Sequence, residues 1–391
     1  MRRPLLAAAA ALGAAALAAS PALAATKTKY VSARGHDRGA CTQAKPCATI
    51  AFAIARTPAG GRVVVSHGHY KGSVKIAKDI SLIGTASPVI NARGLANGIL
   101  VTGPKSAGAS VKGFVVKNAK DEGILAMQTA HVSIIDNLVS DNDRGVSAAH
   151  PSGECAAQGA VPGDCGEGLH LMTVSHAKVI DNTVQDNLGG ILLTDEFGPT
   201  AHNLIKGNSA LDNVGDCGIT LAGHSTAAYV SGRLAPTKAG VFDNQIIDNT
   251  ADGNGTKGLG GGILTAAGAP GSAVYGNLIK GNTANGNGLG GFTLHSHAPG
   301  QYLNGNRVID NTFLHDGIAG NPGGKPGDED AAITHSVGII VFSAVTPLRG
   351  TVVRGNHLGR EYYGIWTQNV PAIPKGANKF AHTVKVDLAQ S

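Results

Sequence analysis

Residues 190–194 read Gly-Ile-Leu-Leu-Thr and residues 218–222 read Gly-Ile-Thr-Leu-Ala, two copies of the unit that decides the fold. In both, glycine precedes aliphatic residues at alternate positions. Further copies begin at Gly123, Gly168, Gly262, Gly291, Gly338 and Gly364. Alternation with a period of two is the pattern of a short β-strand that buries one face. We therefore expect Leu193 and Leu221 to point inward and Leu192 to project outward.

A second repeat follows the first and ends in asparagine near a turn. Ile134-Ile135-Asp136-Asn137 and Val179-Ile180-Asp181-Asn182 show its form. The same asparagine position recurs at Asn208, Asn249, Asn282, Asn311 and Asn356. Asparagine tolerates the left-handed backbone region at such turns, and asparagines stacked on successive coils can hydrogen-bond as a ladder. These residues are therefore expected to be structural.

Short strands repeated at this spacing leave both backbone edges unpaired unless the units stack on one another. Stacking as coils about 4.8 Å apart pairs strand on strand. The repeat predicts an all-β protein, a single-stranded right-handed parallel β-helix, with its handedness following the preference of parallel crossovers. A β-propeller is excluded because its blades need about 40 residues each, and Asn182 and Asn208 are too close in sequence for that.

The N-terminus has the form of a signal peptide. Arg2 and Arg3 precede an apolar run, and Pro21-Ala22-Leu23-Ala24 offers a cleavage site. We expect residues 1–24 to be removed, residues 25–391 to form one β-helix domain, and the protein to be secreted. No second stretch predicts a membrane span. The net charge of +6 includes no basic block beyond the leader, which argues against nucleic acid as a partner.

Two further features are a capping helix at the N-terminal end of the solenoid and a set of cysteines that could form disulfides. Residues 47–56 read as a short amphipathic helix that would cap the first coil. Export permits disulfides, and two cysteine pairs each flank a short loop. We expect Cys41 to bond to Cys47 and Cys155 to Cys165. Cys217 would remain, either as a small buried apolar residue or as a reactive thiol.

The N-terminal strands resemble a known family. Tyr30-Val31-Ser32, Gly60-Gly61-Arg62-Val63-Val64-Val65 and Asp79-Ile80-Ser81-Leu82-Ile83-Gly84 are similar to the entry of the pectate-lyase-like right-handed parallel β-helix superfamily. That superfamily contains pectate and alginate lyases, polygalacturonases, uronan epimerases and non-catalytic β-helix proteins. The resemblance implies a polysaccharide as partner, with Ca²⁺ as a candidate cofactor, and a monomer is expected. The sequence departs from uronan lyases because neither outward column contains lysine or arginine.

Candidate site residues come from two places. The first is the second and fourth positions after each glycine, which should share the solvent face, and the second is the residues that flank these strands. Inserted loops at about 143–165, 224–240 and 315–335 would wall a groove over the same coils. The catalytic candidates are Asp195, Asp216, Glu196, His170, His224 and His295. The substrate-binding candidates are Thr194, Thr220, Thr293, His297, Phe342 and Trp366.

These residue types fit the cleavage of a glycosidic bond, which needs a proton donor and a base or nucleophile. We expect Asp195 and Asp216 to form the carboxylate pair, with Glu196 as a substitute, and the histidines to position or protonate the substrate. Phe342 and Trp366 can stack on sugar rings. A lyase or epimerase with a histidine base is the alternative within enzymes.

A non-catalytic polysaccharide-binding or cell-surface β-helix is the alternative outside enzymes. Each candidate residue also has a structural interpretation. Asp195 could cap a turn, since it follows a strand and precedes Phe197-Gly198-Pro199. Two histidines without a third ligand are weak evidence for a metal. The acidic run 328–330 could be a solvated loop or a calcium site. A convergent cluster of carboxylates and histidines would favour an enzyme over a binding protein.

Overall fold

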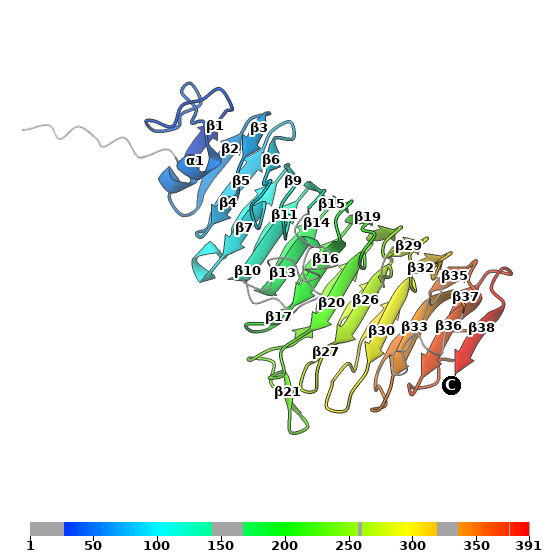
Figure 1. The fold of residues 1–391 in the computed structure, drawn as a ribbon. Helices are drawn as coiled ribbons and strands as arrows, with labels where there is room; N and C mark the ends of the chain where they lie inside the picture. The colour runs from blue at the N-terminus through cyan, green and yellow to red at the C-terminus, as the bar shows by residue number, and fades with distance from the viewer. Residues whose placement is uncertain (1–26, 143–166, 257–259, 319–334, 375, 391) are drawn as a thin grey trace, which may run out of the picture.

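The computed structural model describes residues 27–142, 167–256, 260–318, 335–374 and 376–390. Figure 1 shows coil after coil stacked into an elongated solenoid that runs from the N-terminal to the C-terminal end. Almost every strand pairs in parallel with the equivalent strand of the next coil, and the strands form long sheets along the stack. The predicted all-β right-handed parallel β-helix is therefore confirmed.

The sheet that carries the glycine-led strands has fourteen strands. They are β4 (Val74–Ile76), β7 (Ile99–Thr102), β10 (Ile124–Ala130), β13 (Glu167–Ser175), β16 (Gly189–Thr194), β17 (Thr200–Ala201), β20 (Ile219–Gly223), β23 (Val241–Phe242), β26 (Ile263–Ala267), β27 (Val274–Tyr275), β30 (Phe292–Ser296), β33 (Val337–Ser343), β36 (Tyr363–Gln368) and β38 (Val386–Gln390).

Two eleven-stranded sheets complete the coils. The first contains β1 (Thr28–Val31), β2 (Gly61–Val65), β5 (Ile80–Gly84), β8 (Ser110–Lys112), β11 (Ser133–Ile135), β14 (Lys178–Ile180), β18 (Leu204–Lys206), β24 (Gln245–Ile247), β28 (Leu278–Lys280), β31 (Arg307–Ile309) and β34 (Val352–Arg354). The second contains β3 (His69–Lys71), β6 (Val89–Asn91), β9 (Val115–Lys117), β12 (Leu138–Ser140), β15 (Thr183–Gln185), β19 (Ser209–Leu211), β25 (Thr250–Asp252), β29 (Thr283–Asn285), β32 (Thr312–Leu314), β35 (His357–Gly359) and β37 (Lys379–Phe380).

The interior is built as the alternation predicts. Ile191, Leu193, Ile219 and Leu221 are completely buried in one continuous core. The register places aliphatic residues of successive coils on one another, because Ile191 pairs with Ile219 and Leu193 with Leu221. Burial of such side chains contributes most of the stability of a solenoid.

The asparagine ladder is confirmed. The Asn182 side-chain amide donates to Oδ1 of Asn208, and the Asn208 amide donates to Oδ1 of Asn249. The ladder runs through Asn137, Asn182, Asn208, Asn249, Asn282, Asn311, Asn356 and Asn378. A second ladder occupies another corner through Asn142, Asn187, Asn213, Asn254, Asn287 and Asp316. These side chains also satisfy backbone groups at the turns, which would otherwise be buried without partners.

The outward face of the glycine-led sheet differs from the prediction. Leu192 and His170 are completely buried, and Leu125 is 1% exposed. The prediction that these columns face solvent was therefore wrong. One reason for this burial is that the strands stack in register, so each side chain is covered by its neighbours on the adjacent coils. A further cause is the segment after β20, which folds back over the end of β16.

The capping helix and the disulfide lie at the N-terminal end. Helix α1 (Ile50–Arg56) begins after Thr49, whose side chain accepts a hydrogen bond from the backbone N–H of Phe52. It packs against β1, β2 and β4, as expected of a cap. The Cys41–Cys47 disulfide is present, and Cys217 is a buried free thiol.

Several predicted features lie outside the described residues: the signal peptide, Cys155, Cys165, the acidic run 328–330, the whole loop 143–165 and most of the loop 315–335. The loop 224–240 is described and contains the small antiparallel pair β21 (Tyr229–Val230) and β22 (Arg233–Leu234). Within the described residues, no helix is long and apolar enough to cross a membrane.

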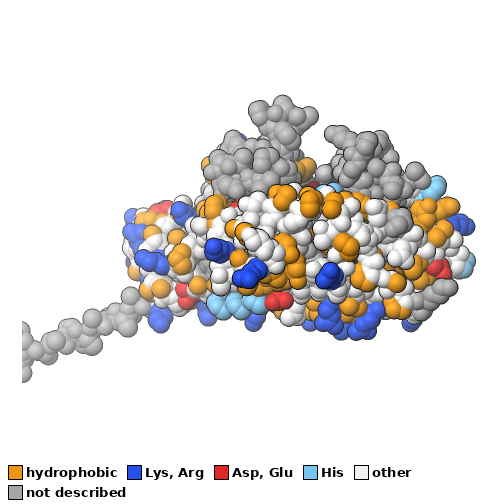
Figure 2. Space-filling model, turned by 90° about the horizontal axis from the view of Figure 1, so that it is seen from below, with side chains coloured by type: hydrophobic (Ala, Val, Ile, Leu, Met, Phe, Trp, Pro, Cys, Tyr) orange, Lys and Arg blue, Asp and Glu red, His pale blue; other side chains and the backbone are white. Residues whose placement is uncertain are grey.

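Aromatic rings also stack along the outside of the coils. His131, His176 and His202 are exposed and lie ring on ring, with centroids 4.9 and 5.0 Å apart. Figure 2 shows histidines gathered in a short band on the surface. All three have a positive φ, so they occupy equivalent turns of successive coils. We call these three residues the histidine stack.

Candidate functional site

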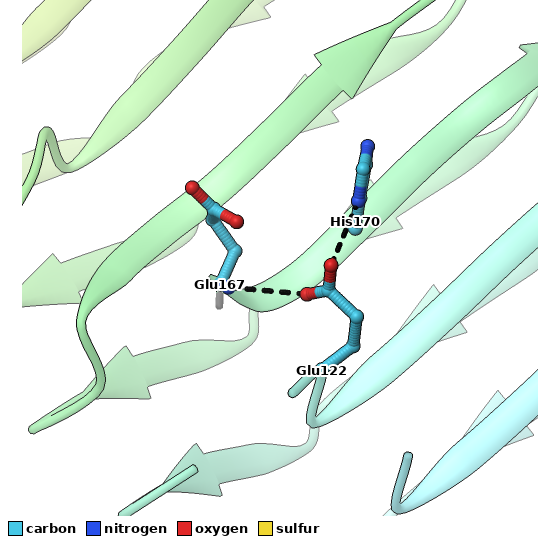
Figure 3. A group of neighbouring side chains, drawn as sticks. All are labelled: Glu122, Glu167 and His170. Atoms are coloured by element: carbon cyan, nitrogen blue, oxygen red, sulfur yellow. Dashed lines mark hydrogen bonds and ion pairs between the residues drawn. The ribbon is translucent and has the colours of Figure 1, made fainter. Parts of the chain in front are cut away.

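The candidate site begins on the outer face of the glycine-led sheet, where two glutamates share one column. Ile124 pairs with Leu169, so Glu122 and Glu167, each two residues earlier, lie at the same level on neighbouring coils. Glu167 in turn pairs with Gly189 on the next coil. His170 follows on the same strand as Glu167, three residues later (Figure 3). Stacking of coils therefore brings together residues that are distant in sequence.

The three side chains converge closely. His170 Nδ1 lies 2.9 Å from Oε1 of Glu122, and the backbone N–H of Glu167 donates to Oε2 of Glu122 at 3.1 Å. One ligand-type atom from each residue lies within 4.8 Å of those of the other two. Glu122, Glu167 and His170 are 1%, 2% and 0% exposed. Their burial makes any net charge in this cluster costly.

A hydrogen-bonded network continues from His170 across the next two coils. His170 Nε2 lies 2.8 Å from the Thr194 hydroxyl, which donates to Oε2 of Glu196. Oε1 of Glu196 lies 2.8 Å from Nδ1 of His224. We call this chain of five residues, which starts at Glu122, the polar network. Its far end is slightly exposed, at 6% for the Glu196 side chain and 5% for that of His224.

The electrostatics of Glu196 favour the carboxylate form. Burial alone would raise its pKa, but the hydrogen bonds with His224 and with the Thr194 hydroxyl help to hold the pKa below its ordinary value. A carboxylate next to an imidazole can exchange protons with it. The Glu196–His224 pair is thus able to perform acid–base chemistry near neutral pH.

Asp195 lies beside this pair but is used differently. Its Oδ1 accepts hydrogen bonds from the backbone N–H groups of His224 and Ser225, at 2.7 and 3.0 Å. Its Oδ2 accepts from the N–H of Gly240 at 2.6 Å. Burial raises the pKa of Asp195, while these three amides partly lower it. The geometry matches the capping interpretation, because both oxygens secure the two ends of the 224–240 loop.

The structure does not bring Asp195 and Asp216 together. Ile191 pairs with Ile219, so Asp216 lies level with the residue before β16, whereas Asp195 follows its last residue. Seven residues of strand separate these levels, roughly 20 Å. That separation exceeds the range of glycosidase carboxylate pairs. The expected pair was wrong because the two aspartates occupy opposite ends of adjacent strands. Asp216 is partly exposed and accepts from the N–H of Cys217.

A second group lies on the same face towards the C-terminal end. His297 Nε2 lies 2.8 Å from Nδ1 of His295, and the His297 ring contacts Phe342. Phe342 stacks on Trp366 with centroids 6.1 Å apart. Phe342 and Trp366 are each only 5% exposed. His295 lies two coils beyond the β20 strand that leads to His224, about 10 Å along the stack.

The threonine candidates are distributed between these groups. Thr194 belongs to the polar network. Thr220 and Thr293 are each 4% exposed and lie on the intervening and following coils, paired with Leu192 and Leu264. The prediction required both threonines to face solvent, and both are buried instead.

A pocket of about 870 Å³ lies beside the 224–240 loop. Its lining includes Tyr229, Tyr275, Tyr302 and Arg349. Tyr302 contacts both other tyrosine rings, at 5.0 and 5.5 Å. Tyr229 lies five residues after His224, so one loop links the pocket to the polar network. Ring faces with a nearby arginine suit a polar ligand with a flat apolar side, such as a sugar.

Sequence reasoning did not assign Glu122, Glu167 or the tyrosine pocket to the site. A signal for the glutamates was present. Glu122 precedes Gly123-Ile124 and Glu167 precedes Gly168-Leu169, so both occupy the same offset before a glycine-led strand. Equal offsets on stacked coils imply adjacent side chains. The tyrosines had no comparable signal because their loops differ in length.

The fold is a right-handed parallel β-helix that carries a buried carboxylate–histidine network on one outer face. Residues 77–257 match the family described as periplasmic copper-binding protein (NosD), and this range includes the whole polar network. A search of curated proteins found no match.

Solved structures share the fold at low identity. The catalytic domain of a GH87 α-1,3-glucanase in complex with nigerose is 12% identical, with a TM-score of 0.52, over 95% of this chain and 66% of that one. The Dettilon tailspike protein is 14% identical, with a TM-score of 0.48, over 88% and 64%. A pectate lyase is 14% identical, with a TM-score of 0.46, over 90% and 78%. The chain thus spans slightly less than two thirds of the first two proteins.

Proposed function

We propose that this protein is a secreted enzyme that cleaves glycosidic bonds of a polysaccharide, with Glu196 and His224 as its acid–base pair. The observation that supports this proposal is the polar network, in which two carboxylates, two imidazoles and a hydroxyl form one chain across neighbouring coils. Such convergence is what distinguishes an enzyme from a surface that only binds. The catalytic domain of the GH87 α-1,3-glucanase, solved in complex with nigerose, adds a carbohydrate precedent on the same fold.

The roles follow from position in the network. Glu196 supplies the carboxylate that receives a proton or stabilises positive charge, and His224 supplies the proton to the leaving oxygen. Both lie at the more exposed end. Thr194, His170 and Glu122 are positioning residues, because each orients the next through a hydrogen bond.

Substrate binding is assigned to surfaces on either side of this pair. Sugar units on one side would contact the His295–His297 pair and the edge of Phe342. On the other side, the tyrosine pocket would hold a sugar against Tyr229 or Tyr302. Asp195 supports this arrangement because it anchors the loop that carries both His224 and Tyr229.

The test is incubation with a panel of neutral and acidic polysaccharides, read by reducing-end release and by the absorbance of unsaturated uronates. The first readout alone indicates a hydrolase, and both together indicate a lyase. Glu196→Gln should abolish turnover while retention on the polysaccharide persists. Glu361→Gln is the matched control, since Glu361 is also a buried glutamate but lies far along the stack. Retention without turnover by the parent would replace the enzyme with a binding protein.

A further inference from the structure

We propose that Glu122, Glu167 and His170 bind one divalent transition-metal ion. The site is argued from its own donors and does not depend on the polysaccharide proposal. Two carboxylates and one imidazole place ligand-type atoms within 4.8 Å of one another (Figure 3). Donors this close together need to move only slightly to bind a single ion at bond lengths near 2.0–2.2 Å.

The hydrogen-bond direction at Thr194 provides a second, independent observation. The Thr194 hydroxyl has one proton, and it donates that proton to Glu196. Thr194 must therefore accept from Nε2–H of His170. In a neutral imidazole the other nitrogen, Nδ1, then presents a lone pair to Oε1 of Glu122 at 2.9 Å. Two acceptors at this distance share either a proton, carried by the ring or by the Glu122 carboxyl group, or a metal ion that both of them bind.

Charge balance favours the metal ion over the proton. With one shared proton, whichever of the two groups carries it, the three residues sum to a charge of minus one, in a place where each is at most 2% exposed. A divalent ion with a neutral imidazole brings the sum to zero. A net charge is unfavourable in a buried place, so a divalent ion suits these three side chains better than a single proton does. His170 would then be fixed by Thr194 as metal-bound histidines are fixed by outer partners.

The neighbouring coil leaves room for this cluster. Gly189 faces Glu167, and a Cβ built there would lie 2.9 Å from Oε1 of Glu167 and 3.3 Å from Cβ of Asp216. Any other residue at position 189 would push the Glu167 carboxylate from its place. The glycine thus preserves a cradle next to the donors, which an ordinary packed strand would fill.

The donor set determines which metal is expected. Calcium and magnesium prefer oxygen ligands throughout, and Cu⁺ prefers thioether and thiolate sulfur. One imidazole with two carboxylates instead suits Zn²⁺ and Mn²⁺, and three protein ligands leave a position open for water or substrate. The ion proposed here is therefore of the Zn²⁺ or Mn²⁺ type, and not the Ca²⁺ considered from the sequence.

The test is calorimetric titration of chelator-treated, full-length secreted protein with ZnCl₂, MnCl₂ and CaCl₂, together with the shift in melting temperature. We expect one Zn²⁺ or Mn²⁺ per chain, a higher melting temperature with metal, and no comparable response to Ca²⁺. Glu167→Gln and His170→Gln should each weaken binding at least ten-fold and remove the temperature shift. Glu167→Gln retains the shape of the side chain, so a folded variant is expected.

The control addresses the histidine stack, an exposed group that could take up zinc at the surface. The variant His131→Asn/His176→Asn/His202→Asn should retain the one-to-one site. Three outcomes would overturn the proposal. They are a folded parent that takes up neither Zn²⁺ nor Mn²⁺, uptake that Glu167→Gln leaves unchanged, and uptake that only the triple variant abolishes.

Discussion

The Asp195 carboxylate accepts a hydrogen bond of 2.6 Å from the backbone N–H of Gly240, 45 residues further along the chain. With the N–H groups of His224 and Ser225 on its other oxygen, it closes the 224–240 loop at both ends. Gln301 does the same for another turn, where its Oε1 accepts from the N–H groups of His297 and Ala298. The solenoid therefore uses single buried side chains to anchor the loops that lie over its outer face.

Replacing Asp195 by asparagine should loosen this loop. In the variant, the side-chain NH₂ group would stand where one carboxylate oxygen of Asp195 accepts from a backbone N–H, so that hydrogen bond is lost. The loss of one hydrogen bond to a charged group lowers the free energy of unfolding by about 1.5–3 kcal/mol. We expect a lower free energy of unfolding and faster proteolysis within residues 224–240. Asp216→Asn is the control, since Asp216 is partly exposed and accepts a hydrogen bond from the N–H of its neighbour Cys217, outside the 224–240 loop. Equal protease sensitivity of the two variants would contradict the anchoring role.

The two faces of β16 should contribute similarly to stability. Leu193 lies in the main core, and Leu192 on the opposite face is just as completely buried. Replacement of either by alanine should cost about 2–5 kcal/mol in chemical denaturation. Leu95→Ala is the control, because Leu95 is 42% exposed and should lose far less. A small loss for Leu192→Ala would restore the original view that this face is open.

The coil architecture was predictable because it rests on local patterns. Alternation along each strand shows which side chains point into the coil, and the recurrence of asparagine marks the turns. Alternation says nothing about what covers the other face, so His170, Leu192 and Trp366 were wrongly expected in solvent. That information depends on loops and on stacking, neither of which the strand pattern encodes.

The candidate site was only partly predictable for a related reason. His170, Thr194, Glu196 and His224 were selected from the sequence because each lies at or just beyond a glycine-led strand, and hydrogen bonds connect them in the structure. Glu122 was missed because a long insertion separates it from Glu167, although the coils that carry them are adjacent. Asp195 and Asp216 were paired wrongly because they lie on adjacent coils but at opposite ends of the strands.

The asparagine ladder should be sensitive to single changes. Asn208 accepts from the N–H and side-chain amide of Asn182, and it donates to the Val179 carbonyl and to Asn249. Alanine would leave several buried groups without partners, each costing about 1–3 kcal/mol. We expect a large drop in the midpoint of urea denaturation. Lys206→Ala, with a side chain 51% exposed, should change it little. Comparable midpoints for the two variants would contradict a structural ladder.

The cysteines predict a specific labelling pattern. Burial, followed by the nearby Asp216 charge, raises the pKa of the Cys217 thiol well above its ordinary value. The native protein should therefore resist alkylation at Cys217 until it is unfolded. Peptide mapping without reduction should join Cys41 to Cys47, and the prediction that Cys155 is joined to Cys165 is checked in the same map. Rapid labelling of Cys217 in the folded state would restore the reactive-thiol alternative.

Near the C-terminal end, two acidic side chains should make stability depend on pH. Burial raises the pKa of Glu361 from 4.5 to about 7, against the lowering effect of nearby backbone groups. Burial also raises the pKa of Asp316 well above its ordinary value, and Glu361 adds to that shift. Between about pH 4.5 and 7 the folded protein thus binds more protons than the unfolded chain, so the contribution of Glu361 to stability falls as pH rises.

Glu361→Gln removes this pH-dependent contribution to stability, because glutamine stays neutral in the folded and unfolded states. The variant should therefore gain stability relative to the parent as the pH rises from 5 to 8, measured by urea denaturation at each pH. Above about pH 7 no further gain is expected from Glu361, since the parent's carboxyl is then ionised whether folded or not. Asp387→Asn is the control at an exposed position of β38 and should show no such trend. A difference between parent and Glu361→Gln that is the same at pH 5 and pH 8 would contradict a raised pKa at Glu361.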